Sequence, residues 1–367
     1  MLIASTHGYW NLPTLWFFLI VVLWVGYFVL EGFDFGVGML LPFVGRNVPE
    51  RGTLIRTIGP VWDGNEVWLL VAGGATFAAF PGWYATLFSG FYLALFLVLV
   101  GLIVRGIAIE YRNKHPEEHW RARWDTTLAA SSAVPALLWG VALADVVNGV
   151  PIDAHGNYTG NLLTLLHPYA LFGGVTTLAL FAFHGALFLT LRTTGELHER
   201  ARATSLRLAL PAAALVFGFL VWTYVNAASA HNKGLVPGVV PIAAICLPFA
   251  AGAFARAGRE ALAFASTALS IVLITLTLFL NLYPRVIVSS TDNAFSPTIF
   301  TTSSSHYTLT AMSIVALVLT PLVLLYQTWT YWVFRARLGD PAAAEIRSPL
   351  DLLERSPLGR GRPDPGG

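Results

Sequence analysis

Four acidic side chains lie at the edges of apolar segments in the first part of the chain. Glu31 and Asp34 are three residues apart, and so are Asp63 and Glu66. Residues with this spacing share one face of a helix. A carboxylate at membrane depth is costly, and it usually marks an ion pair, a polar cavity or a proton relay. The four carboxylates are therefore candidates for taking up protons and passing them inward.

A structural role explains the same spacing. With Asp63 at the N-cap of a helix and Glu66 at position N3, the two form a capping-box-like arrangement at the positive end of the helix dipole. That position stabilises the carboxylate and opposes proton exchange unless burial raises its pKa. Glu31 and Asp34 are either interfacial charges balanced by Arg46 or water, or a polar lining that forms a wet path with Asp63. Both alternatives stay open for each pair.

The rest of the chain places these acids in a membrane. Of its 367 residues, 56% are hydrophobic and 11% are charged, whereas a soluble domain carries about 25% charged residues. A spanning helix needs about 20 apolar residues. Nine segments qualify, namely 12–40, 64–81, 83–106, 125–148, 166–191, 206–228, 236–255, 260–283 and 307–334. We expect an all-α integral membrane protein with nine spans, a polytopic domain at 1–338 and a disordered cytoplasmic tail at 339–367.

Basic residues predict the orientation of the spans. Twenty of the 22 Lys and Arg residues fall in loops after odd-numbered spans or in the C-terminal tail, and only Lys233 and Arg285 fall in the opposite loops. The positive-inside rule then puts the N-terminus outside and the C-terminus in the cytoplasm. No basic n-region precedes the first apolar run, so we expect the first span to insert uncleaved. The net charge of +2 gives no sign of nucleic-acid binding.

Haem and metal ligands are scarce in the sequence. His184 is the only histidine well inside a predicted span, and the chain has three methionines to offer as a second axial ligand. We favour a hydrogen-bonded interior histidine over a haem ligand. The single cysteine, Cys246, excludes an intrachain disulfide and a Cys-based metal site. We therefore expect this chain to ligate no haem or metal. Hydroxyl groups in 301–306 are expected to cap the last helix.

Several motifs together resemble subunit II of cytochrome bd-type quinol oxidases. They occur from the first span to the last: Glu31-Gly32-Phe33-Asp34-Phe35-Gly36-Val37-Gly38-Met39, Gly45-Arg46-Asn47, Trp62-Asp63-Gly64-Asn65-Glu66-Val67-Trp68-Leu69, Ala72-Gly73-Gly74-Ala75, Phe88-Ser89-Gly90-Phe91-Tyr92, Gly195-Glu196-Leu197-His198 and Leu324-Leu325-Tyr326. The segment around Asp63 is the most specific of them. One departure is Glu31, where the family often has Asp, and the charge is kept.

The resemblance implies a fold and a complex. The family's subunit II has one peripheral helix and two four-helix bundles. It forms a heterodimer with subunit I, in the bacterial cytoplasmic membrane, that oxidises quinol and reduces dioxygen to water in aerobic respiration. Two b-type haems, one haem d and the quinol site belong to subunit I, which subunit II stabilises. A structural quinone, membrane lipid and a small accessory subunit are further partners implied by the family.

The resemblance also implies residue roles. Asp63 matches a position proposed for proton uptake, and Trp68 matches a position near an oxygen entrance between helices. The candidate proton pathway is therefore Asp63, Glu66, Glu31 and Asp34, and the candidate oxygen route passes Trp68. No family role attaches to His184. The alternatives are a secondary transporter that uses intramembrane carboxylates and a purely structural scaffold; transporter sites usually lie at the membrane midplane.

The predicted topology is testable with reporter fusions. We expect fusions after Pro81 and near Asn157 to report an outside location, and fusions near Glu117 and after Arg337 to report the cytoplasm, because basic residues are retained inside. Paired alkaline phosphatase and green fluorescent protein fusions measure both locations. A cytoplasmic signal at Asn157 would contradict the nine-span topology.

Overall fold

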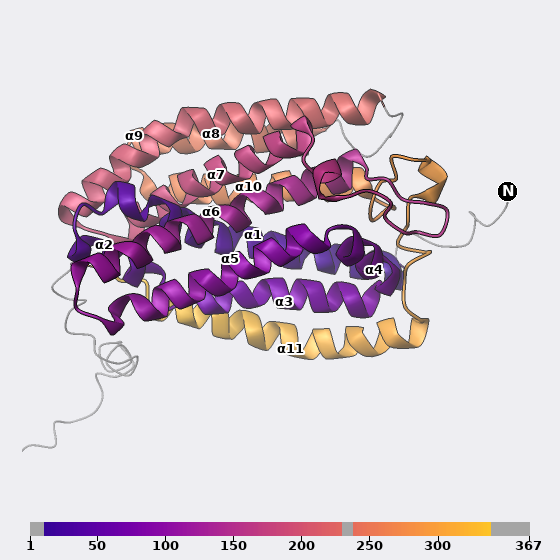
Figure 1. The fold of residues 1–367 in the computed structure, drawn as a ribbon, viewed down its shortest axis with the longest axis horizontal. Coiled ribbons are helices and arrows are strands. Elements are labelled where there is room, and N and C mark those ends of the chain that lie inside the picture. The colour runs from indigo at the N-terminus through magenta and orange to yellow at the C-terminus, as the bar shows by residue number, and fades with distance from the viewer. Residues whose placement is uncertain (1–10, 230–237, 339–367) are drawn as a thin grey trace, which may run out of the picture.

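The computed structural model describes residues 11–229 and 238–338, and in these ranges the chain folds into long helices that run side by side (Figure 1). The α-helices are α1 (Leu12–Val44), α2 (Val48–Ile58), α3 (Trp62–Ala79), α4 (Pro81–Gly90), α5 (Tyr92–Tyr111), α6 (Glu118–Asn148), α7 (Pro168–Arg192), α8 (Gly195–Ser229), α9 (Val239–Arg256), α10 (Glu260–Leu282) and α11 (His306–Val333). Short 3-10 helices are η1 (Arg112–Lys114), η2 (Leu162–Leu165) and η3 (Asn293–Phe295). The predicted tail at 339–367 lies outside the described residues.

Eight of the described helices are long and apolar enough to cross a membrane: α1, α5, α6, α7, α8, α9, α10 and α11. The predicted all-α membrane fold is therefore confirmed. α3 has 18 residues, carries Asp63 and Glu66 in its first turns and does not belong to the eight. Length and composition thus support eight spans, and the expected count of nine depends on α3.

Two elements depart from the predicted segments. α2 is a short helix that lies outside the nine predicted segments. Asn47 caps it by accepting a hydrogen bond from the Glu50 amide at 2.9 Å. The predicted span 83–106 is divided, because α4 ends at Gly90 and α5 begins after Phe91. Pro81 is the first residue of α4, where proline suits a helix start.

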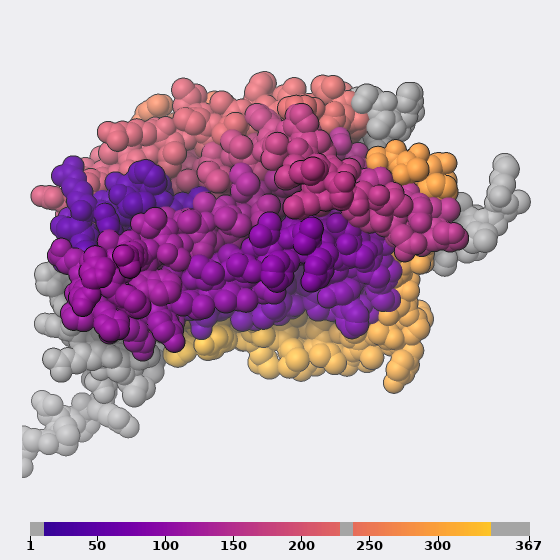
Figure 2. Space-filling view, in the orientation of Figure 1, coloured from indigo at the N-terminus to yellow at the C-terminus, as the bar shows by residue number. Residues whose placement is uncertain are grey.

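α1 is the central helix of the bundle and packs against α3, α6, α7 and α10. Helices α7 to α10 form a closed ring, because each packs on the next and α10 returns to α7. α11 lies along the rim of the molecule (Figures 1 and 2), where only 6% of its most apolar 18-residue stretch is buried. As predicted, a hydroxyl group caps this last helix, since Ser305 accepts from the Thr308 amide at 3.2 Å.

Glycines let α1 and α7 cross at backbone contact. A Cβ added at Gly36 would overlap the carbonyl oxygen of Phe181, and a Cβ added at Gly185 would lie 2.5 Å from the carbonyl carbon of Gly36. Small residues at such crossings allow close helix packing in membranes. At Gly73 and Gly74 of α3, by contrast, an added Cβ meets nothing within 4 Å among the described residues.

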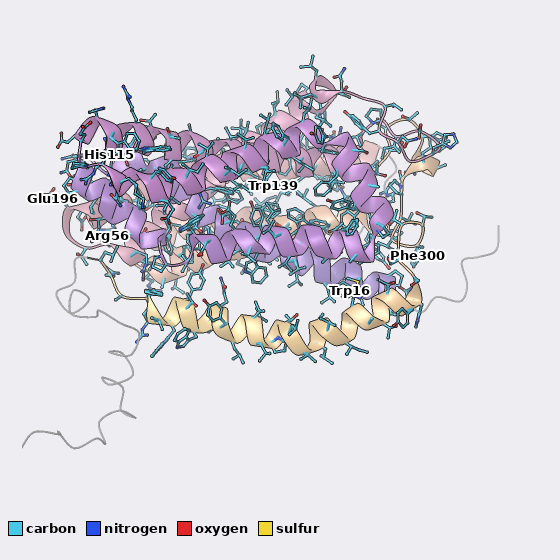
Figure 3. The ribbon with its side chains drawn as sticks, turned by 60° about the horizontal axis from the view of Figure 1, so that its bottom comes forward. Trp16, Arg56, His115, Trp139, Glu196 and Phe300 are labelled. Carbon is cyan, nitrogen blue, oxygen red and sulfur yellow. The ribbon has the colours of Figure 1, made fainter. Side chains whose placement is uncertain are left out.

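An aromatic cluster holds α1 against α6. The Trp139 indole donates a hydrogen bond to the Tyr27 hydroxyl at 3.0 Å, and the ring of Trp24 lies 5.0 Å from that of Trp139 in an edge-on arrangement. Trp139 lies midway along the bundle (Figure 3). Buried Trp and Tyr need partners for their polar atoms, so this pairing sets the relative position of the two helices.

Charged side chains gather at one end of the bundle, where Figure 3 shows Arg56, His115 and Glu196, away from Phe300. Acids there pair with cations of other segments: Asp125 with Arg112 at 2.5 Å, Glu50 with Arg200 at 2.7 Å, and Glu260 with Arg337 at 2.8 Å. The contact with Arg200 holds the pKa of Glu50 below its ordinary value. These pairs join α6 to η1, α2 to α8, and α10 to the segment after α11, at the end that the charge pattern predicts to be cytoplasmic.

We expect Gly36→Ala to reduce the amount of folded protein in the membrane strongly, because the added carbon meets backbone atoms that cannot move aside. Overpacking costs about 1–3 kcal/mol, occasionally more. Gly59→Ala is the matched control, since its Cβ stays at least 3.6 Å from its neighbours. Native gels of detergent extracts measure the yield. Equal yields from the two variants would show that the α1–α7 crossing tolerates separation.

Candidate functional site

α1 carries two predicted site residues into the interior. Glu31 and Asp34 are both 0% exposed. Their spacing places them on one face of α1, as the sequence predicts. The suggestion that they are interfacial charges balanced by Arg46 is wrong: Arg46 lies in the loop after α1, and its backbone amide donates to Glu50 at 2.8 Å.

Arg105 supplies the positive charge that Glu31 faces. This residue of α5 is fully buried, and its Nη1 pairs with Oε1 of Glu31. The guanidinium carbon lies 5.1 Å from the ring centre of Phe35 and 6.0 Å from that of Trp62, which are cation–π distances. The predicted topology counts Arg105 among the basic residues of the loops. This assignment is wrong because α5 continues to Tyr111. The signal in the sequence that could have identified Arg105 as a buried residue is a single charge within an apolar run.

Asn65 joins the acids of α1 to α11. Its amide nitrogen donates to Oδ2 of Asp34 at 2.7 Å. Its amide oxygen accepts from the Tyr331 hydroxyl at 2.7 Å and from Nε2 of Gln327 at 3.2 Å. We call the group formed by Glu31, Asp34, Asn65 and Arg105 the polar cluster. Two hydrogen-bonded groups, one between α1 and α5 and the other between α1, α3 and α11, thus meet at neighbouring positions on α1.

The polar cluster contains more hydrogen-bonding capacity than the protein uses. Oε2 of Glu31, Oδ1 of Asp34, and Nε and Nη2 of Arg105 are buried without a partner among the described residues. The cluster holds two carboxylates and one guanidinium, which pairs with Glu31, so it carries a net charge of −1 when both acids are ionised and is neutral after binding one proton. Ordered water commonly satisfies polar atoms of this kind. The arrangement is chemically suited to hold and exchange a proton.

Asp63 and Glu66 begin α3 but form no capping box. The N-cap is Val61, and no side chain caps the helix. Asp63 is the second helical residue, and its carboxylate accepts only from the adjacent Gly64 amide, at 2.7 Å. The capping interpretation was wrong because the helix starts two residues earlier than it requires. Asp63 is exposed and Glu66 half-buried, and Glu66 lies within electrostatic range of Glu31, Asp34 and Arg105.

Trp68 packs against the central helix. It lies directly over Gly26 of α1, where any added Cβ would overlap its ring. The next residue, Leu69, lines an apolar cavity of about 470 Å³ between α3, α4 and α5 that also reaches Trp24 and Trp139. Trp68 is not part of that lining. The structure therefore brings the predicted oxygen-route residue beside an apolar cavity without placing it inside.

His184 is hydrogen-bonded through both ring nitrogens, as predicted. Nδ1 lies 2.7 Å from the Thr267 hydroxyl and Nε2 lies 3.2 Å from the Val29 carbonyl oxygen. The side chain is fully buried between α7, α10 and α1. Within residues 11–229 and 238–338, no group of three or more His, Cys, Asp or Glu side chains is arranged to hold a metal ion.

Comparisons with known proteins agree with these motifs. Residues 12–334 match the family described as cytochrome bd terminal oxidase subunit II. The chain is 42% identical over 331 residues to cytochrome bd ubiquinol oxidase subunit 2 of Bacillus subtilis, covering 90% of this chain and 97% of that one. It is 38% identical over 357 residues to cytochrome bd-I ubiquinol oxidase subunit 2 of Escherichia coli, covering 88% and 94%.

One solved structure shares the fold. A chain of the bd oxidase from Geobacillus thermodenitrificans superposes with a TM-score of 0.69 at 16% identity, covering 88% of this chain and 99% of that one. At this identity the likeness concerns the fold alone.

We expect Arg105→Met to destabilise the purified protein by about 3–5 kcal/mol, because it leaves buried carboxylates without their counter-charge. The double variant Arg105→Met with Glu31→Met removes both partners and should recover part of the loss. Thermal unfolding of the detergent-solubilised protein measures both effects, with exposed Arg56→Met as the control. A double variant no more stable than Arg105→Met would show that the pair does not act as a unit.

Proposed function

The chain belongs to the cytochrome bd terminal oxidase subunit II family, and on that premise we propose that it works as a heterodimer with subunit I, which it stabilises. The complex oxidises quinol and reduces dioxygen to water in the bacterial cytoplasmic membrane. The two b-type haems, haem d and the quinol site reside in subunit I. Family membership disfavours the secondary transporter and the independent scaffold. A structural quinone and a small accessory subunit complete the proposed complex.

We propose nine spans with the N-terminus outside, α3 being the ninth. An 18-residue helix is about 27 Å long, which approaches the roughly 30 Å hydrocarbon thickness. α3 packs along α1, a helix that qualifies as a span. In this arrangement α11 is the peripheral helix, α7 to α10 form one four-helix bundle, and α1, α3, α5 and α6 form the other.

The faces left open in this chain support docking of subunit I. Leu317 and Leu325 of α11 are 78% and 68% exposed. On α3, Gly73 and Gly74 have room for a closely packed neighbour. In lipid, small residues on a helix favour close helix–helix contact, so a partner helix fits here better than acyl chains. We assign the surface of α3, α5 and α11 to the subunit interface.

The proposed proton route is supported by a series of acids whose burial increases towards the interior. Exposed Asp63 takes a proton from the cytoplasm, half-buried Glu66 follows, and the fully buried pair Asp34 and Glu31 receives it. The unpartnered carboxylate oxygens of that pair give water a place to connect the steps. Arg105 limits the negative charge that this route must hold in a low-dielectric region.

The apolar cavity supports an oxygen route. Dioxygen is small and apolar, so it partitions into the membrane and into cavities without polar groups. The space between α3, α4 and α5 is lined mostly by apolar side chains such as Leu69, Leu87 and Phe88, together with Tyr84 and Tyr92. Trp68 borders the route from its position over Gly26 rather than forming its wall.

We expect Asp63→Asn to slow quinol-dependent oxygen consumption several-fold while assembly and haem content stay normal. Asn keeps the shape and polarity of the side chain but removes its titratable group. Asp63 caps no helix, so Asp63→Ala should show the same turnover defect without loss of assembly. Oxygen-electrode rates and reduced-minus-oxidised spectra of the purified complex measure both.

Glu110→Gln is the matched control, because Glu110 is an exposed acid of α5 at the same end of the bundle. Its turnover should equal that of the wild type. Wild-type turnover and proton uptake in a fully assembled Asp63→Asn enzyme would eliminate the proposed entry point and leave the family assignment untouched.

A further inference from the structure

A second cavity lies near the charged end of the bundle, separate from the space between α3, α4 and α5. It measures about 370 Å³ and is bounded by α1, α7, α10 and α11. Apolar side chains form most of its wall, namely Val29, Leu30, Phe33, Phe188, Leu191 and Phe264. Two arginines, Arg192 and Arg335, also line it. The cavity therefore combines an apolar interior with positive charge at one end of the spans.

Arg192 is a cation without an acid. It is the last residue of α7 and is half-buried, and its Nε is buried with no hydrogen-bond partner among the described residues. Its guanidinium forms no ion pair with any carboxylate in residues 11–229 and 238–338, a property it shares with Arg335 but not with Arg200 or Arg337 at the same end. A buried guanidinium gains most from an anion that can accept its hydrogen bonds.

Arg335 adds a second positive charge to the lining of this cavity. Its Nη1 donates to the Trp332 carbonyl oxygen at 2.6 Å, and its guanidinium carbon lies 4.3 Å from the ring centre of Trp332. These contacts hold the side chain without neutralising it. Tyr331 also lines the cavity, but its hydroxyl already donates to Asn65. Two arginines are thus available to one anionic group.

We propose that this cavity binds an anionic phospholipid, with the headgroup phosphate between Arg192 and Arg335 and an acyl chain along the apolar wall. Arginine recognises phosphate through two parallel hydrogen bonds. Basic pockets between spans on the cytoplasmic side suit anionic headgroups. A quinone would fill the apolar wall but leave both charges unpaired, and inorganic phosphate would pair the charges but leave the wall uncovered. The inference depends on the membrane placement and not on the proton route.

The test is lipid binding to the purified two-subunit complex. The complex is delipidated in detergent and titrated with phosphatidylglycerol or with phosphatidylcholine of the same acyl chains, and native mass spectrometry counts bound lipid. We expect phosphatidylglycerol to bind more tightly than phosphatidylcholine. Arg192→Gln should weaken phosphatidylglycerol about tenfold, the loss expected for one charge-assisted hydrogen-bonded contact. Arg56→Gln, which removes an exposed arginine at the same end, should bind like the wild type.

Arg335→Gln keeps the test decisive if Arg192→Gln fails to assemble, because Arg335 is exposed and its loss should cost no folding stability. It should weaken phosphatidylglycerol by a smaller factor. Equal affinity for the two lipids, or unchanged phosphatidylglycerol binding in both variants, would overturn the proposal. Displacement of the lipid by millimolar inorganic phosphate, or a quinone retained in its place, would overturn it as well.

Discussion

The need to balance Arg105 inside the membrane governs the arrangement of this protein. A guanidinium buried among apolar helices is tolerated only beside an anion, and Glu31 of α1 provides it. Asp34, one turn further along α1, is held by Asn65 of α3, which in turn accepts from Tyr331 of α11. Four helices that are distant in sequence are thereby placed in one register. Because each bond lies where water is scarce, a shift of any one helix would leave a buried charge or dipole exposed to lipid.

The two sides of α1 make different kinds of contact. Towards α6 and α7 the contacts are closely packed and carry no charge. Gly36 and Gly185 bring the backbones of α1 and α7 together, and the Trp139 indole donates a hydrogen bond to the Tyr27 hydroxyl. Such packing supplies rigidity through close contact rather than charge. Towards α3 and α5 the helix presents its carboxylates, and unpartnered polar atoms remain. A rigid side supporting a polar side suits the proton route that we propose, since the acids of such a route must keep their spacing.

The surfaces that remain open explain why the chain acts in a complex. α11 exposes most of its apolar length, and Gly73 and Gly74 of α3 face no neighbour among the described residues. In the arrangement that we propose, haem and quinol chemistry belong to subunit I, and the contribution of this subunit is structural and electrostatic. His184 fits that division, because Thr267 and Val29 occupy both of its ring nitrogens. Several acids at the charged end are held in internal ion pairs, whereas Arg192 pairs with no carboxylate among the described residues.

Apolar runs of sufficient length determined the helices from sequence alone, because a chain in lipid must satisfy its backbone hydrogen bonds within each segment. Local motifs around Asp63 and Gly195 determined the family, and helical spacing placed Glu31 and Asp34 on one face. Tertiary structure alone decided that Arg105 is a buried counter-ion, that Asp63 is no cap, and that Gly36 meets Gly185. Arg105 lies 74 residues from Glu31, and no local pattern encodes which helix will lie beside α1. Partner choice in a buried ion pair depends on how whole helices pack, so it follows from the assembled bundle and not from the neighbours along the chain.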